Sequence, residues 1–374
     1  MSKRGRGSPA KKVDSVNFAG GSEGFRLAYG DIVRARAPLR LGLAGGGTDV
    51  APYCQIKGGA VLNAAISWYA YATLSPAPAG KVVFRATDLD QEVILDADPD
   101  MPLDGPLALH RGVWRRLVKQ FNYNRPVSIC ITTCSDVPAG SGLGSSSTVV
   151  VAMVQAFREY LGLSLNEYDV ARLAVAIERQ DLSLKGGLQD QYAATFGGVN
   201  FIEFNPGSEA LVNPLRVRPS ILAELEASLV LYFTGVSRES AAIIEDQSKL
   251  LHEQKEDSIA AMDALKQDAF AMKDCLLRGD LRGVGSVLSR SWEAKKRTSS
   301  RISNPTIERA YETAMSSGAH AGKVSGAGGG GFMMFLVDPV LRSSVVRALG
   351  QEQGEIMTCH LTKQGAAAWR TAAA

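Results

Sequence analysis

The sequence is poor in the side chains that most often bind metals or act as a base beside a nucleophile. Its 374 residues include only four histidines and five cysteines. No histidines lie close together, which argues against a histidine-based metal site or a catalytic triad. Cys130 and Cys134 have no second cysteine or histidine pair to complete a zinc site. The odd, scattered set of cysteines predicts reduced thiols and therefore a cytoplasmic protein.

Long apolar runs and secretion signals are also missing. The longest apolar stretch, residues 59–74, is interrupted by Asn63 and Ser67 and is too short to cross a bilayer. Residues 1–30 form a basic, Gly- and Ser-rich tail without the apolar core of a signal peptide, and they predict disorder. Residues 1–26 carry a net charge of +4, which leaves the remainder near neutral. A near-neutral body implies no nucleic-acid-binding surface, and we expect no nucleic-acid or membrane partner. The alternative is a basic tail that contacts nucleic acid or a membrane.

The most informative segment is residues 138–148, where three glycines at alternate positions run into three serines. Glycine has no Cβ, so backbone N–H groups in such a loop can turn toward an anion. A helix that begins near Ser145 would add its free N–H groups and the positive end of its dipole. The alternative is a flexible loop with a good helix cap. The candidate ATP-binding residues are Pro138, Ala139, Gly140, Ser141, Gly142, Leu143, Gly144, Ser145, Ser146 and Ser147.

Two standard nucleotide-binding motifs do not fit this loop. No lysine follows the glycines, which excludes a P-loop, and the serine at position 147 breaks a dinucleotide-binding fingerprint. The loop therefore indicates a nucleotide kinase outside the P-loop and Rossmann groups.

The apolar patterns predict two α+β domains, at 31–210 and 211–374. Alternating or continuous apolar residues predict strands at 31–44, 61–74, 82–87, 127–133, 199–204, 229–233 and 331–337. Helical spacing predicts helices at 107–122, 145–161, 166–178, 238–256, 258–278, 281–297, 306–317 and 340–349, with a further short helix inside 185–198.

Two further segments stand out beside the 138–147 loop, namely residues 36–49, which end in Gly-Gly-Gly-Thr-Asp, and the glycine run at 323–332. In this order and spacing, the three segments resemble the motifs of the GHMP kinases, over roughly residues 30–365. The resemblance implies a ribosomal S5 domain 2-like N-terminal domain, with a sheet of four or five strands and helices on one side. It also implies a ferredoxin-like C-terminal domain, with ATP and the acceptor in the cleft between the two.

Within this superfamily, the first and third segments, together with residues 187–191 and 292–296, look like those of D-glycero-D-manno-heptose 7-phosphate kinases. That likeness implies phosphoryl transfer from ATP to the anomeric hydroxyl of the sugar, giving a heptose 1,7-bisphosphate for surface-glycan synthesis. Three alternatives stay open: a kinase for another sugar such as fucose or galactose, a GHMP-type decarboxylase, and a sugar-binding relative without turnover. We expect a monomer or homodimer.

The resemblance also assigns the chemistry to particular residues. Asp190 matches the segment with the catalytic aspartate, where a carboxylate orients the hydroxyl and accepts its proton. Arg40 would lie beside it and steady the charge of the transferring group. Glu178 and Ser146 would hold Mg²⁺, which needs few protein ligands. The structural alternatives are a helix-capping aspartate, a strand ion pair and a solvated helix-face glutamate.

The acceptor is expected to meet polar groups on the loops of the first and third segments. The candidate substrate-binding residues are Thr48, Asp49, Gly187, Tyr192, Lys323, Gly328 and Gly329. The alternatives are an Asx turn at Asp49, a core role for Tyr192 and a glycine hairpin that binds no ligand. The sugar phosphate needs a cation, for which the sequence offers five candidates without choosing among them, Lys185, Lys295, Lys296, Arg297 and Arg301.

Overall fold

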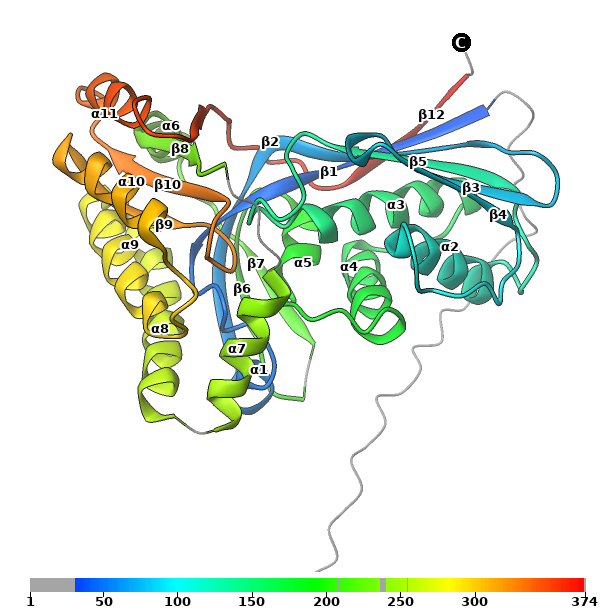
Figure 1. Cartoon of the computed structure of the whole chain (residues 1–374), viewed down its shortest axis with the longest axis horizontal. Helices are drawn as coiled ribbons and strands as arrows, with labels where there is room; N and C mark the ends of the chain where they lie inside the picture. The colour runs from blue at the N-terminus through cyan, green and yellow to red at the C-terminus, as the bar shows by residue number, and fades with distance from the viewer. Residues whose placement is uncertain (1–30, 208, 236–239, 254, 373–374) are drawn as a thin grey trace, which may run out of the picture.

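A computed structural model describes residues 31–207, 209–235, 240–253 and 255–372, which form two sheets with helices packed against them (Figure 1). The expected tail at residues 1–30 lies outside the described residues. The larger sheet has eight strands, in the order β12-β1-β2-β5-β3-β4, with β6 paired to β2 and β7 to β6. These are β1 (Asp31–Ala44), β2 (Gly59–Pro76), β3 (Lys81–Ala86), β4 (Gln91–Asp96), β5 (Ile129–Ser135), β6 (Val199–Phe204), β7 (Ala210–Pro214) and β12 (Ala367–Ala372).

Strand β2 joins the two halves of the molecule. Its first residues pair with β6 and its last residues with β5, while β1 runs antiparallel beside it. Residues 59–66 are buried without alternation, whereas burial alternates further along the strand. A strand buried on both faces reads as a continuous apolar run, which is what residues 59–66 are apart from Asn63. The first half of β2 therefore lies deep in the molecule, against the loop that contains Thr48.

Four helices cover one face of the larger sheet (Figure 1). Helix α3 is buried on nearly all of its faces, so its many β-branched residues pack in the core. Asn166 caps the next helix through a reciprocal bond with Asp169, and that helix ends in a single π-helical turn, Ile177–Asp181. The four helices are α2 (Ala108–Phe121), α3 (Ser145–Leu161), α4 (Glu167–Ala176) and α5 (Gln189–Phe196).

The smaller sheet has the order β11-β8-β10-β9, which with its crossover helices is the ferredoxin-like arrangement that the resemblance implied. Its central strand β10 is buried on both faces, between two apolar clusters. The elements are α6 (Pro219–Ser228), β8 (Leu229–Phe233), α7 (Ser240–His252), α8 (Glu256–Arg278), α9 (Leu281–Lys296), α10 (Pro305–Ser316), β9 (Ala319–Val324), β10 (Phe332–Val337), α11 (Arg342–Leu349) and β11 (Glu355–Met357).

The larger sheet differs from the expected four or five strands because it gains short or polar strands that the apolar pattern does not mark. Strand β4 is largely exposed, and β12 returns from the end of the chain to pair with β1 (Figure 1). The domain division at residue 210 stays a prediction, and residues 367–372 lie in the first sheet. Within the described part of the chain, no helix has the length and apolar character needed to cross a membrane.

Candidate active site

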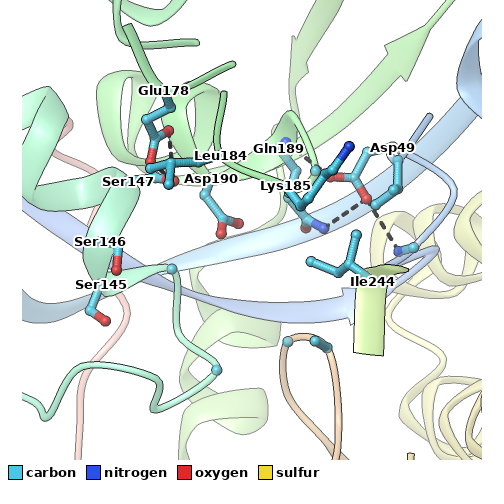
Figure 2. Close-up of a pocket in the computed structure, with 18 of the residues that line it drawn as sticks. Asp49, Ser145, Ser146, Ser147, Glu178, Leu184, Lys185, Gln189, Asp190 and Ile244 are labelled. Carbon is cyan, nitrogen blue, oxygen red and sulfur yellow. Dashed lines mark hydrogen bonds between the residues drawn. The ribbon is translucent and has the colours of Figure 1, made fainter. Parts of the chain in front are cut away.

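A cavity of about 510 Å³ lies between the two halves of the molecule. In Figure 2, Asp190 lies in the middle, with Ser145 and Ser146 to one side and Asp49, Lys185 and Gln189 to the other. We call these sides the α3 end and the Asp49 end. The remaining walls come from Glu178 and Arg179 in the π-helical turn, α7, the last turn of α9 and the β9–β10 loop.

The glycine loop forms the α3 end and has the geometry of an anion cradle. Gly140, Gly142 and Gly144 have φ values of 73°, 82° and 80°, a left-handed conformation that favours glycine. Helix α3 starts directly after Gly144 without a side-chain cap, and its first backbone bond joins the Thr148 N–H to the Gly144 carbonyl at 2.9 Å. Within the described chain, the N–H groups of residues 145–147 therefore have no backbone acceptor and can bind phosphate oxygens.

The third glycine segment supports this loop by backbone packing. A Cβ on Gly142 would lie 2.6 Å from the Ser325 carbonyl oxygen, and a Cβ on Gly326 or Gly331 would collide with the backbone of the loop. The Phe332 N–H donates to the Ser141 carbonyl at 2.9 Å. Two glycine runs that are far apart in sequence are thus packed backbone against backbone, and each needs the other's lack of side chains.

Arg40 fixes Asp190 at the centre of the cavity. The Arg40 Nε and Nη2 atoms donate to Asp190 Oδ1 at 2.8 and 2.5 Å, and Nη1 donates to the Gly142 carbonyl at 2.6 Å. The Asp190 side chain remains 23% exposed, and its Oδ2 atom accepts no hydrogen bond from the described residues. A Cβ on Gly144 would lie 2.9 Å from the Asp190 Cγ atom. One carboxylate oxygen is therefore anchored, while the other can face a ligand beside the glycine loop.

Glu178 lies beneath the first turn of α3, in the π-helical turn. The Ser147 hydroxyl lies 3.0 Å from each Glu178 oxygen, and the Gln191 amide also donates to this carboxylate. Burial raises the pKa of Glu178, while Arg179, Gln191 and Ser147 act in the opposite direction. The serine that contacts Glu178 is Ser147. Ser146 is exposed and lines the cavity. The predicted pairing of Ser146 with Glu178 stays a prediction.

Asp49 is almost fully buried and holds the start of α5. Its carboxylate accepts the N–H groups of Leu188 and Gln189 at 2.9 and 3.1 Å, together with the Gln189 side-chain amide at 3.1 Å. A Cβ on Gly187 would collide with this carboxylate. Asp49 and Gly187 line the cavity, and the carboxylate orients the helix turn that carries Asp190. Their predicted contact with the substrate stays a prediction.

Several predicted ligand residues lie away from the cavity. The Thr48 hydroxyl is fully buried, between the carbonyls of Gly45 and Ala60. Lys323 donates to the Gly42 carbonyl at 2.9 Å from inside the core. The structure therefore gives these side chains internal partners instead of the expected acceptor contacts. Other predicted ligand residues outside the lining are Tyr192, Gly328, Gly329, Pro138, Ser141 and Leu143.

Of the five candidate cations, the structure places Lys185 and Lys295 at the cavity and not the other three. Lys296 pairs instead with Glu293 at 2.9 Å, and Arg297 and Arg301 are exposed elsewhere. Sequence reasoning also missed Arg179, Gln189 and two α7 residues, Ile244 and Gln247, which line the cavity. Arg179 donates to the Gly187 carbonyl at 2.7 Å, a contact with no local sequence signal.

Comparisons with known proteins place the chain among sugar and mevalonate kinases of one family. Residues 108–198 match the GHMP kinases N terminal domain, and residues 272–356 match the GHMP kinases C terminal domain. A Campylobacter jejuni D-glycero-alpha-D-manno-heptose 7-phosphate kinase is 46% identical over 90% of this chain and 99% of its own.

Two solved structures share the fold at comparable identity. One is described as a D-glycero-D-manno-heptose 1-phosphate kinase from Bacteroides thetaiotaomicron, with a TM-score of 0.76, 42% identity and coverage of 90% of this chain and 98% of that one. The other is a putative sugar kinase from Campylobacter jejuni, with a TM-score of 0.75, 45% identity and coverage of 91% and 98%. Both domain matches and a relative that is 46% identical over 90% of the chain show that this chain belongs to the GHMP kinase family.

Proposed function

We propose that this GHMP kinase transfers the γ-phosphoryl group of ATP to the anomeric hydroxyl of D-glycero-D-manno-heptose 7-phosphate, giving the 1,7-bisphosphate. The observation that carries the proposal is the position of Asp190, between an anion cradle at the α3 end and a second polar wall at the Asp49 end. The heptose kinase names of relatives at 42% and 46% identity support the choice of sugar. Those names differ in the phosphate they cite, so the acceptor position needs its own test.

Residues at the two ends of the cavity have different roles in the proposed phosphoryl transfer. The N–H groups at the start of α3 bind the nucleotide phosphates, helped by the helix dipole. Asp190 Oδ2 orients the acceptor hydroxyl and takes its proton as the oxygen bonds to the γ-phosphorus and the bond to ADP breaks. Arg40 keeps the carboxylate in place and offsets the negative charge of the transferring group.

We assign the Mg²⁺ of the reaction to the side of the cavity that Glu178 occupies. Its carboxylate and the nearby serine hydroxyls are hard oxygen donors, which suits this cation. Among the described residues, no group of three or more His, Cys, Asp or Glu side chains could hold a metal alone. A bound ion here would take its other ligands from nucleotide phosphates and water. When bound, Mg²⁺ neutralises charge on the phosphates during transfer.

The Glu178→Gln variant tests this assignment. Glutamine has nearly the same shape and removes a buried charge, so we expect unchanged or slightly higher thermal stability. The Mg²⁺ concentration that gives half-maximal rate should rise at least about tenfold, the lower range for disturbing a metal site. Glu159→Gln is a suitable control, because this carboxylate pairs with Arg370 outside the cavity. An unchanged Mg²⁺ requirement in Glu178→Gln would remove Glu178 from the site.

The sugar itself is tested by turnover. Purified protein is assayed for ADP formation with heptose 7-phosphate, heptose 1-phosphate, fucose and galactose, and the product is examined by ³¹P NMR. We expect the highest kcat/KM with heptose 7-phosphate and a new phosphate at the anomeric carbon. Preference for fucose or galactose would assign another sugar, and no sugar-dependent ADP formation would favour a relative without turnover.

A further inference from the structure

The Lys295 ammonium lines the cavity but has no role in the phosphoryl transfer proposed for this site. Lys295, in the last turn of α9, is only 3% exposed, yet its side chain lines the cavity. Its ammonium donates to the Gly326 carbonyl and forms no ion pair with any described residue. An ammonium has three donors, so two are left for a ligand.

The neighbours of Lys295 place it at the Asp49 end. A Cβ on Gly46 would lie 3.9 Å from both the Lys295 Nζ and the Gln189 Nε2 atoms. Gln189 in turn donates to Asp49 and lies with it on the side of Asp190 away from Ser145 and Ser146 (Figure 2). Lys295 therefore lies at the Asp49 end, where the acceptor is expected, and its bond to the Gly326 carbonyl also joins it to the segment that packs against the cradle.

Lys295 is a buried cation that has no ion-pair partner among the described residues, although the Asp49 carboxylate is near enough to act on it. The pKa of Lys295 is lowered to about 8, mainly by burial and also by the Arg40 guanidinium, while Asp49 acts in the opposite direction. A buried ammonium without an anion is unfavourable by itself. Lys185 also lines the cavity but is exposed, so its charge carries little of this cost. An anionic ligand at the Asp49 end would give the Lys295 charge a partner.

We propose that Lys295 determines acceptor specificity by binding the phosphate ester that the sugar already carries. This inference rests on the proposed function and extends it, since it explains how the site would select a sugar phosphate over an unphosphorylated sugar. A charged hydrogen bond of this kind corresponds to about a 10- to 100-fold contribution to affinity.

The test is the Lys295→Met variant, which approximates the unbranched aliphatic part of the side chain and removes the ammonium. We expect KM for heptose 7-phosphate to rise about 10- to 100-fold, with kcat and the KM for ATP within about threefold of the parent. The advantage of heptose 7-phosphate over unphosphorylated heptose in kcat/KM should shrink by a similar factor. The melting temperature should not fall, because a buried charge is removed.

Lys296→Met is the matched control. It changes the next residue of the same helix, whose ammonium pairs with Glu293 and Glu308 outside the cavity, and it should leave both KM values unchanged. A fall in kcat at unchanged sugar KM would overturn the proposal in favour of a contact with the γ-phosphoryl group. Equal losses on both sugars would indicate a hydroxyl contact and would also overturn it.

The two proposals fail in different ways. If the unmodified protein does not phosphorylate heptose 7-phosphate, the proposed function fails, and the role of Lys295 fails with it. If the unmodified protein turns over this sugar and Lys295→Met behaves the same, only the role of Lys295 is lost.

Discussion

Replacing Asp190 by asparagine is expected to lower kcat by about 10²- to 10⁴-fold, the range for loss of a general base. Asparagine has nearly the same shape and keeps an oxygen that can accept from Arg40, but it cannot take the proton of the acceptor hydroxyl. Binding of a non-hydrolysable ATP analogue should be retained, because the cradle at residues 140–147 is untouched. The measurements are kcat from ADP release and the Kd of the analogue by calorimetry.

This substitution also breaks an ion pair with a buried arginine, and that effect needs its own control. Asp181→Asn breaks a similar pair, because Asp181 Oδ1 lies 2.5 Å from Arg116 Nη2 and its side chain is 24% exposed, close to the 23% of Asp190. Asp181 lies outside the cavity lining. We expect Asp181→Asn to change stability without a comparable loss of kcat. Near-normal turnover in Asp190→Asn would exclude its role as the base.

Gly142→Ala is expected to lower kcat/KM for ATP on the order of 10²-fold, since displacements of about 1 Å at a site can have effects of this size. Gly142 has a φ of 82°, and an added Cβ would meet the Ser325 carbonyl oxygen at 2.6 Å. Neither partner can move aside as a flexible side chain would, so the cradle and the third glycine segment must separate. Steady-state kinetics at varied ATP, together with a melting curve, measure the effect.

Gly162→Ala separates the clash from the backbone strain. Gly162 ends α3 with a φ of 64°, so alanine there carries the same left-handed cost of roughly 1–2 kcal/mol. A Cβ at this position meets no atom within 4 Å. We therefore expect Gly162→Ala to lower the melting temperature while kcat/KM for ATP stays near the parent value. If both variants lose ATP kinetics equally, packing between the two glycine segments is not what shapes the cradle.

Local sequence pattern was enough to locate the glycine loop and the helix start at the α3 end of the cavity. Alternate glycines that run into Ser145 predict both a loop with left-handed residues and a helix start, because φ preference and helix capping depend on neighbouring residues. The same applies to Asp190, whose segment predicts a short helix, observed as Gln189–Phe196. The conformational preferences behind these features are local, although distant residues such as Asp49 and Arg40 then hold them in place.

Residue type was a poor guide to which polar side chains face the cavity. Thr48 and Asp49 are adjacent on one loop, yet the Thr48 hydroxyl turns inward to the Ala60 carbonyl while Asp49 reaches the start of α5. Both partners come from other parts of the chain. Buried polar groups require hydrogen-bond partners, and the fold determines where those partners are.

By itself, the sequence determined the family motifs, most of the long helices and strands, and the cradle at residues 140–147. Only the tertiary structure decided that Lys295 lines the cavity while Lys296 pairs with Glu293 beside it, and that β12 completes the first sheet. The physical reason is the same in each case. Glycine conformation and helix periodicity are local properties, whereas the burial of a charge and the pairing of a strand depend on residues that are distant in sequence.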